Sequence, residues 1–150
     1  MSDNNIQKFD RLTGAIFAKL YAAFPVHVPL THEEFRYLLL PEEEIEGLHF
    51  SESGELKQRS IEFFFSSIEW LTVSGYIIHK GSTPGNPHTY QCVLSAKALE
   101  ALKSTPSNLG GDTLGSKIAD AAKAGTKSVL GELSSQALGI ALSALTSQFH

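Results

Sequence analysis

The part of the chain that most constrains its fold lies between residues 56 and 102, where a helical hydrophobic pattern gives way to a strand pattern. Apolar side chains first recur every three or four positions, at Ile61, Phe64, Phe65, Ile68 and Leu71. This spacing places them on one face and predicts a helix from about Glu55 to Val73. Gly75 follows, where such a helix needs a left-handed residue to end.

Two strand-like runs follow this glycine, at residues 76–80 and 89–94. The segment between them contains two prolines and two glycines, which disfavour helix and strand and favour a hairpin loop. Ser95 is placed to cap a short helix over residues 96–103. The sequence therefore predicts a long helix, a β-hairpin and a short helix, in that order.

The first forty residues predict two more helices and a brief strand. Apolar residues repeat at helical spacing over residues 6–24, and a proline ends this pattern. Residues 26–30 are β-branched and contain a second proline, which suits a short edge strand. Thr31 and Glu34 form a capping-box pattern, in which each side chain bonds the backbone of the other, and predict a helix over residues 32–40.

Composition and charge limit the possible functions. With 150 residues, of which 42% are hydrophobic, the chain can build one compact core, so we expect one domain and an appendage. The net charge of −4 gives no global basic field for a polyanion. The single cysteine, Cys92, excludes an internal disulfide, and the first residues lack the pattern of an export signal. We therefore expect a cytoplasmic protein.

The order helix, small strand, helix, helix, hairpin, helix is the layout of winged-helix domains. The runs IEFFFSSIEWLTVSGYIIHK and YQCVLSAKALEAL resemble the third helix, the wing and the exit helix of bacterial winged-helix regulators. Those regulators often have a threonine and a glycine where this chain has Ser95 and Ala98. The resemblance implies a mainly α-helical fold with a small β-hairpin, and a winged-helix domain over residues 1–103.

In DNA-binding members of this family, the third helix lies in the major groove. The side chains that match by position are Lys57, Gln58, Arg59 and Glu62 on the helix, with Lys80 and His88 on the wing. Residues 31–62, however, contain three basic residues and nine glutamates, a difference of −6, which opposes approach to phosphate. The acidic stretch at 41–54 is either a solvated loop or a docking face for a basic partner.

No residue pattern predicts catalysis. His79, His88 and Cys92 fall on the predicted hairpin, but they lack a fourth ligand and the spacing of a zinc motif. The glutamates at 42–44 are adjacent and so diverge in direction, unlike a catalytic carboxylate pair. The sequence has no nucleophile-elbow, P-loop or dinucleotide-binding motif. We therefore expect no enzyme activity, no cofactor and no metal.

Phe63 and Trp70 are seven residues apart and so share a stripe of the long helix that differs from its core face. One explanation is that Trp70 packs on the first helix or on the hairpin. The other is that the C-terminal helix or a second subunit covers the stripe, because grouped surface aromatics mark contacts. Both residues are therefore candidates for a protein interface.

Residues 104–113 form a linker rich in small polar residues and glycine, and residues 114–150 predict one long amphipathic helix or two. The apolar stripe of this segment supplies further candidate interface residues, namely Ile118, Gly125, Val129, Leu133 and Ile140. Residues 133–149 are uncharged but too short and polar to span a membrane. The stripe can pack on a sister helix, on a partner protein or back on its own domain.

These patterns together predict a non-catalytic, bacterial-type adaptor that binds itself, a basic partner protein, or both. Self-association would form a homodimer through residues 114–150. The alternative is a dimeric transcription regulator with Lys57, Gln58, Arg59 and Lys80 at the DNA, although the local acidity disfavours nucleic acid. A third class, a membrane-active effector, depends on the uncharged end of the chain and lacks nearby basic residues.

Overall fold

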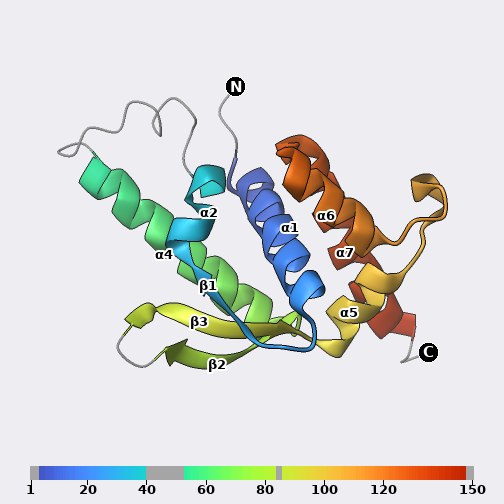
Figure 1. Cartoon of the computed structure of the whole chain (residues 1–150), viewed down its shortest axis with the longest axis horizontal. Coiled ribbons are helices and arrows are strands. Elements are labelled where there is room, and N and C mark those ends of the chain that lie inside the picture. Colours follow the sequence, from blue (N-terminus) through green and yellow to red (C-terminus); the bar gives the residue numbers. More distant parts are fainter. Residues whose placement is uncertain (1–3, 40–52, 84–85, 148–150) are drawn as a thin grey trace.

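The computed structural model describes residues 4–39, 53–83 and 86–147, so most of the acidic stretch at 41–54 lies outside the described residues. Its elements are α1 (Asn5–Ala23), β1 (Val28–Thr31), α2 (His32–Leu39), α4 (Ser53–Val73), β2 (Ile77–Thr83), β3 (Asn86–Leu94), α5 (Ala96–Lys103), the 3-10 helix η1 (Ser107–Leu109), α6 (Leu114–Ala124) and α7 (Lys127–Ser147). The fold is mainly helical, with one small antiparallel sheet of three strands along one side (Figure 1).

Side-chain caps fix where the helices begin. At the start of α1, Asn4 and Gln7 form a capping box, with Gln7 N donating to Asn4 Oδ1 at 2.8 Å. At the start of α5, Ser95 Oγ accepts from Ala98 N at 3.3 Å, so the predicted serine cap is confirmed. These bonds satisfy backbone donors that have no partner inside the helix, and this explains why both boundaries are visible in the sequence.

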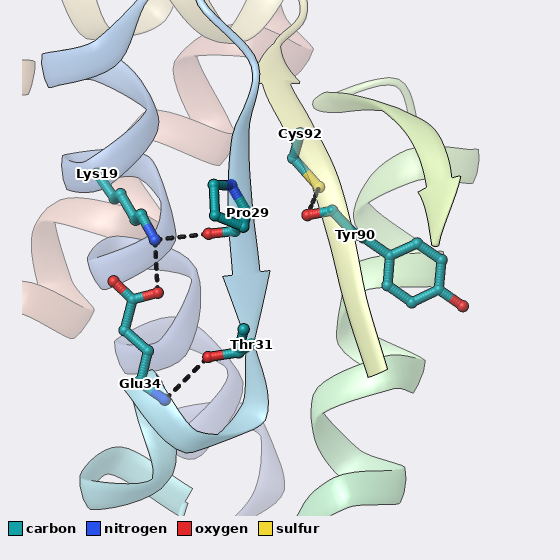
Figure 2. Close-up of polar contacts among 6 residues, drawn as sticks. All are labelled: Lys19, Pro29, Thr31, Glu34, Tyr90 and Cys92. Atoms are coloured by element: carbon teal, nitrogen blue, oxygen red, sulfur yellow. Dashed lines mark hydrogen bonds and ion pairs between the residues drawn. The ribbon is translucent and has the colours of Figure 1, made fainter. Parts of the chain in front are cut away.

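The capping box predicted at the start of α2 is only half correct. Glu34 N donates to Thr31 Oγ1 at 3.3 Å, as expected. The Glu34 carboxylate instead accepts from Lys19 Nζ at 2.6 Å, and the same Nζ donates to the Pro29 carbonyl at 2.5 Å (Figure 2). One ammonium group therefore joins α1 to both β1 and α2.

The strand order in the sheet is β1-β3-β2, with both pairs antiparallel. β1 places Val28 opposite Cys92, and β2 places Ile77 opposite Leu94. The predicted brief edge strand is confirmed, and its edge position explains why it tolerates Pro29. The two hairpin strands are longer than predicted, because pairing continues toward the turn beyond a register shift that follows His79.

α4 contributes a row of buried side chains to the core. Phe64, Ile68 and Leu71 are almost fully buried, and Phe35 of α2 stacks on the Phe64 ring at a centroid distance of 6.0 Å. Gly75 ends the helical segment at a φ of 84°, so the predicted left-handed cap is confirmed. The inner face of α4 is therefore committed to the core, and only its other faces are available for contacts.

The C-terminal segment forms two helices that pack on α1 and α5 (Figure 1). Gly125 adopts a φ of 72° and donates its N–H to the Ala121 and Ala122 carbonyls, which ends α6. Within the described residues, α1 and α7 make the most extensive contact between any two helices. Of the alternatives that the sequence leaves open, the structure therefore contains the segment folded back on its own chain.

Glycines allow α1 and α7 to approach closely. A Cβ added at Gly14 would lie 2.8 Å from the Leu130 carbonyl oxygen, so α1 and α7 touch through backbone there. Gly131 also lies against α1, though less tightly, since a Cβ there would be 3.2 Å from Arg11 Cγ. Such contacts bury the apolar stripe of α7 in the core shared with α1.

Candidate protein-interaction surface

A strongly apolar hollow lies between the start of α1 and the middle of α4. It has a volume of about 350 Å³ and is lined by Asn5, Ile6, Phe9, Phe63, Ser66, Ser67 and Trp70. We call it the α1/α4 groove. It contains both aromatic residues that the sequence predicted to form a separate stripe of the long helix.

Trp70 is anchored on one side and open on the other. The Trp70 and Phe9 rings pack edge-to-face at a centroid distance of 5.3 Å, and the Trp70 ring stacks on Tyr76 at 6.0 Å with an interplanar angle of 18°. Lys97 Nζ lies 4.3 Å from the centre of the Tyr76 ring. Despite these contacts, 51% of Trp70 is exposed. The tryptophan is therefore held in a fixed orientation while much of its apolar surface faces solvent.

Other exposed apolar side chains extend this surface. Ile6 of α1 is 73% exposed and Val73 of α4 is 79% exposed. Phe63 is partly buried, with Lys8 Nζ 5.4 Å from the centre of its ring. Ile6, Phe63 and Trp70 line one hollow, and Val73 is one helical turn beyond Trp70. Grouped exposed apolar residues of this kind mark contact sites more often than isolated ones.

Glu62 and Glu69 of α4 do not line the groove themselves but flank its two α4 aromatics in sequence, and we call these two residues the α4 rim. Glu62 and Glu69 are exposed, and each immediately precedes one of the groove aromatics, Phe63 and Trp70. Neither carboxylate has an ion-pair partner among the described residues. The spacing of seven residues places both on the same outer stripe of the helix. The α4 side of the groove therefore presents two negative charges to solvent.

The residues that the sequence matched to DNA contacts are at the surface. Lys57, Gln58 and Arg59 are exposed on the first half of α4, and Lys80 is exposed on β2. The exposed stripe of α4 continues from these residues into Glu62 and Glu69. The helix thus carries both signs of charge along its length. The side chain of His88 lies outside the described part of the chain.

The five C-terminal candidates do not form one surface. Ile118 and Leu133 are buried in the core of the chain itself, so their predicted place in an external interface is wrong, because α1 covers the stripe they belong to. Gly125 caps α6, and Ile140 packs partly buried against the same core. Only Val129 has a substantially exposed apolar side chain among these five.

A buried polar pair joins α2 to α4. His32 Nε2 lies 2.7 Å from Ser60 Oγ, and Ser60 Oγ donates to the Lys57 carbonyl at 2.8 Å. Because this bond uses the only hydroxyl proton, the imidazole N–H donates to the serine oxygen. An activated nucleophile needs the opposite polarity, with the serine donating to the histidine. The pair therefore serves as a structural link between two helices.

Cys92 is buried in the sheet, where its Sγ donates weakly to the Tyr90 carbonyl at 3.7 Å (Figure 2). Burial raises the pKa of this thiol to about 12, against a smaller lowering effect of the Lys19 charge. The thiol is therefore neutral at physiological pH, in contrast to reactive cysteines, which are thiolates. In the described part of the chain, no three His, Cys, Asp or Glu side chains are grouped closely enough to hold a metal ion.

Sequence reasoning found the α4 side of the groove and missed the α1 side. The heptad spacing of Phe63 and Trp70 separated them from the core face. Ile6 and Phe9 are three residues apart on α1, which was a visible signal of one helical face, but only the tertiary packing shows that this end of α1 faces α4. Comparisons of the chain with protein-family models, curated proteins and solved structures give no match. Among the described helices, none has the length and apolarity that a bilayer span requires.

Proposed function

We propose that this chain is a non-catalytic adaptor with a winged-helix type of fold, which binds a partner protein in the α1/α4 groove. The observation that carries this proposal is the half-exposed Trp70, fixed by Phe9 and Tyr76 beside the exposed Ile6. Tryptophan is enriched among residues that dominate binding energy, and anchors that are already ordered lose little entropy on binding. The lone buried Cys92 accords with a cytoplasmic location.

The order of elements supports the winged-helix part of the proposal. Three helices precede the β2–β3 hairpin among the described elements, β1 adds an edge strand to it, and α5 follows. In that family α4 corresponds to the helix that reads DNA. In this chain the outer stripe of α4 carries Glu62 and Glu69, which disfavours phosphate and favours a protein partner.

A second candidate function is DNA binding by the first half of α4. It is favoured by the joint exposure of Lys57, Gln58 and Arg59 on α4 and of Lys80 on the hairpin. Retention on random duplex DNA that weakens steeply with salt would support this function instead. Self-association through α6 and α7 has less support, since Ile118 and Leu133 are buried within the chain.

Photo-crosslinking tests the adaptor function directly. A photo-reactive amino acid replaces Ser66, which is exposed and lines the groove, and a second variant carries it at Ser135, which is exposed on α7. We expect the Ser66 variant to crosslink to a discrete partner in cell extract, and the Trp70→Ala exchange to abolish that product. The Ile78→Ser exchange, at a similarly exposed residue of β2, should leave it unchanged.

Equal crosslinking from both positions, or a Ser66 product that persists after Trp70→Ala, would contradict the proposal. Deleting residues 114–150 is unsuitable as a test. α7 covers one face of α1, so the deletion would expose core residues. The newly exposed apolar surface would itself bind other proteins non-specifically.

A further inference from the structure

We infer that the occupant of the α1/α4 groove is an amphipathic helix of another protein with Lys or Arg along one edge. This inference rests on the proposed function of the groove and adds the chemistry of the partner. Three observations support it. They are the dimensions of the groove, the placement of the charges around it, and the fact that the positively charged helices of this chain are already packed in its own fold.

The groove has the form of a site for helix side chains. Its walls are two helices, and Phe63 and Trp70 lie along one wall at a spacing of seven residues, about 10.5 Å along the helix axis. A third helix lying along the groove would present apolar residues at i, i+3 or i+4, and i+7 over the same length. The volume of about 350 Å³ accepts a few side chains rather than a whole segment.

The charges around the groove are asymmetric. On the α4 rim, Glu62 and Glu69 are exposed and have no ion-pair partner among the described residues. On the α1 side, Lys8 supplies a positive charge, held over the Phe63 ring. A bound helix therefore gains from basic residues on the edge that faces α4 and loses from basic residues that face α1. This asymmetry also orients the helix in the groove.

A second copy of this chain is a poor source for such a helix. Of the described helices with a net positive charge, α1 already forms one wall of the groove. The other two are α5 and α6, and their apolar residues Leu102 and Ile118 are fully buried in the core of their own chain. Either helix could bind in the groove of a second copy only if its own chain partly unfolded.

Trp70 is the only tryptophan of the chain and lies in the groove, so its fluorescence reports occupancy directly. The probe is a tryptophan-free helical peptide with Leu at i, i+4 and i+7 and Lys along one edge. The matched peptide has Glu in place of every Lys. We expect the Lys peptide to shift Trp70 emission to the blue and to saturate. The Glu peptide should bind at least about tenfold more weakly, and salt should reduce this difference.

Charge variants of the full chain test the rim. Glu62→Gln combined with Glu69→Gln should weaken the Lys peptide about fivefold to tenfold while leaving the melting temperature unchanged, as for exposed charges. Glu132→Gln, at an exposed glutamate of α7, is the control and should not affect binding.

Each remaining outcome is informative. Equal binding of the two peptides would overturn the inference that the partner helix is basic. It would still support the proposal that the groove binds a protein helix. Binding of neither peptide would overturn both. A blue shift that grows with protein concentration, without any effect of the peptides, would identify a second copy as the occupant and overturn the inference as well.

Discussion

Gly115 at the start of α6 faces the ring of Tyr21 in α1 so closely that a Cβ on the glycine would lie 2.7 Å from the ring carbons. Real side chains do not approach to this distance, so either the tyrosine or the helix would have to move. Gly139 of α7 provides a contrast, since a Cβ there would meet nothing within 4 Å.

Exchanging these two glycines for alanine should therefore have opposite effects on stability. Gly115→Ala should lower the free energy of unfolding by about 1–3 kcal/mol, because the added methyl group overpacks the contact with α1. Gly139→Ala should raise it by about 0.4–1 kcal/mol, because alanine restricts the unfolded chain and favours the helix. Urea unfolding of the full chain measures both. Stabilisation of similar size in the two variants would show that α6 does not pack against Tyr21 as described.

The His32–Ser60 link predicts a position-specific effect at two buried serines of α4. Ser60→Ala should lower the free energy of unfolding by about 1–3 kcal/mol, because it removes the acceptor of a buried imidazole N–H. Ser67 is equally buried, but among the described residues its hydroxyl bonds only the Phe63 carbonyl of its own helix. Ser67→Ala should therefore cost no more than about 0.5 kcal/mol. Thermal unfolding compares the two, and equal losses would refute a specific role of the histidine.

The Lys19 ammonium group should contribute more to stability than an ordinary surface lysine. It is partly buried and bonds both the Pro29 carbonyl and the Glu34 carboxylate. Lys19→Met should therefore lower the free energy of unfolding by about 1–2 kcal/mol. Lys103→Met is the matched control, since Lys103 is well exposed and its ion pair with Glu100 is 3.6 Å long. We expect Lys103→Met to lower the free energy of unfolding by less than about 0.5 kcal/mol.

The raised pKa of Cys92 predicts a loss of stability in alkali. The unfolded thiol titrates near its ordinary value of 9.0 and the folded thiol near 12, so the folded state holds its proton more tightly. The stabilising contribution is complete below pH 9 and falls as the pH rises toward 12, by up to about 1.4 kcal/mol per pH unit.

Urea unfolding at pH 8 to 10.5 measures this slope, and Cys92→Ala should reduce it relative to the wild type. Iodoacetamide offers a second check at pH 8, where labelling should require unfolding. Rapid labelling of the native chain would contradict the buried, neutral thiol.

Much of the fold was predictable because its boundaries are encoded in single residues. Ser95 and Gly75 mark the ends of helices by bonds that depend on nearby backbone only. Glu34 shows where this local reasoning stops: its capping role was inferred from a neighbour in sequence, but its carboxylate binds Lys19, fifteen residues away. The sequence pattern does not show which residue distant in sequence lies next to the Glu34 carboxylate in the fold.

The C-terminal helices show the same limit at a larger scale. An apolar stripe on residues 114–147 looks identical whether it packs on α1, on a sister helix or on another protein. The sequence left one or two helices open for this segment and predicted Gly125 as an interface residue, whereas Gly125 ends α6 in the left-handed conformation. For the groove, the spacing of Phe63 and Trp70 indicated a second face of α4. It could not indicate that Ile6 and Phe9 form the opposite wall.

The extensive contact of α1 with α7 also sets an order of events during synthesis. α1 leaves the ribosome more than a hundred residues before α7, so the face of α1 that α7 covers stays exposed during this interval. At about 5–20 residues per second this interval lasts several seconds or more. We therefore expect the nascent chain to bind chaperones that shield hydrophobic helices during this interval.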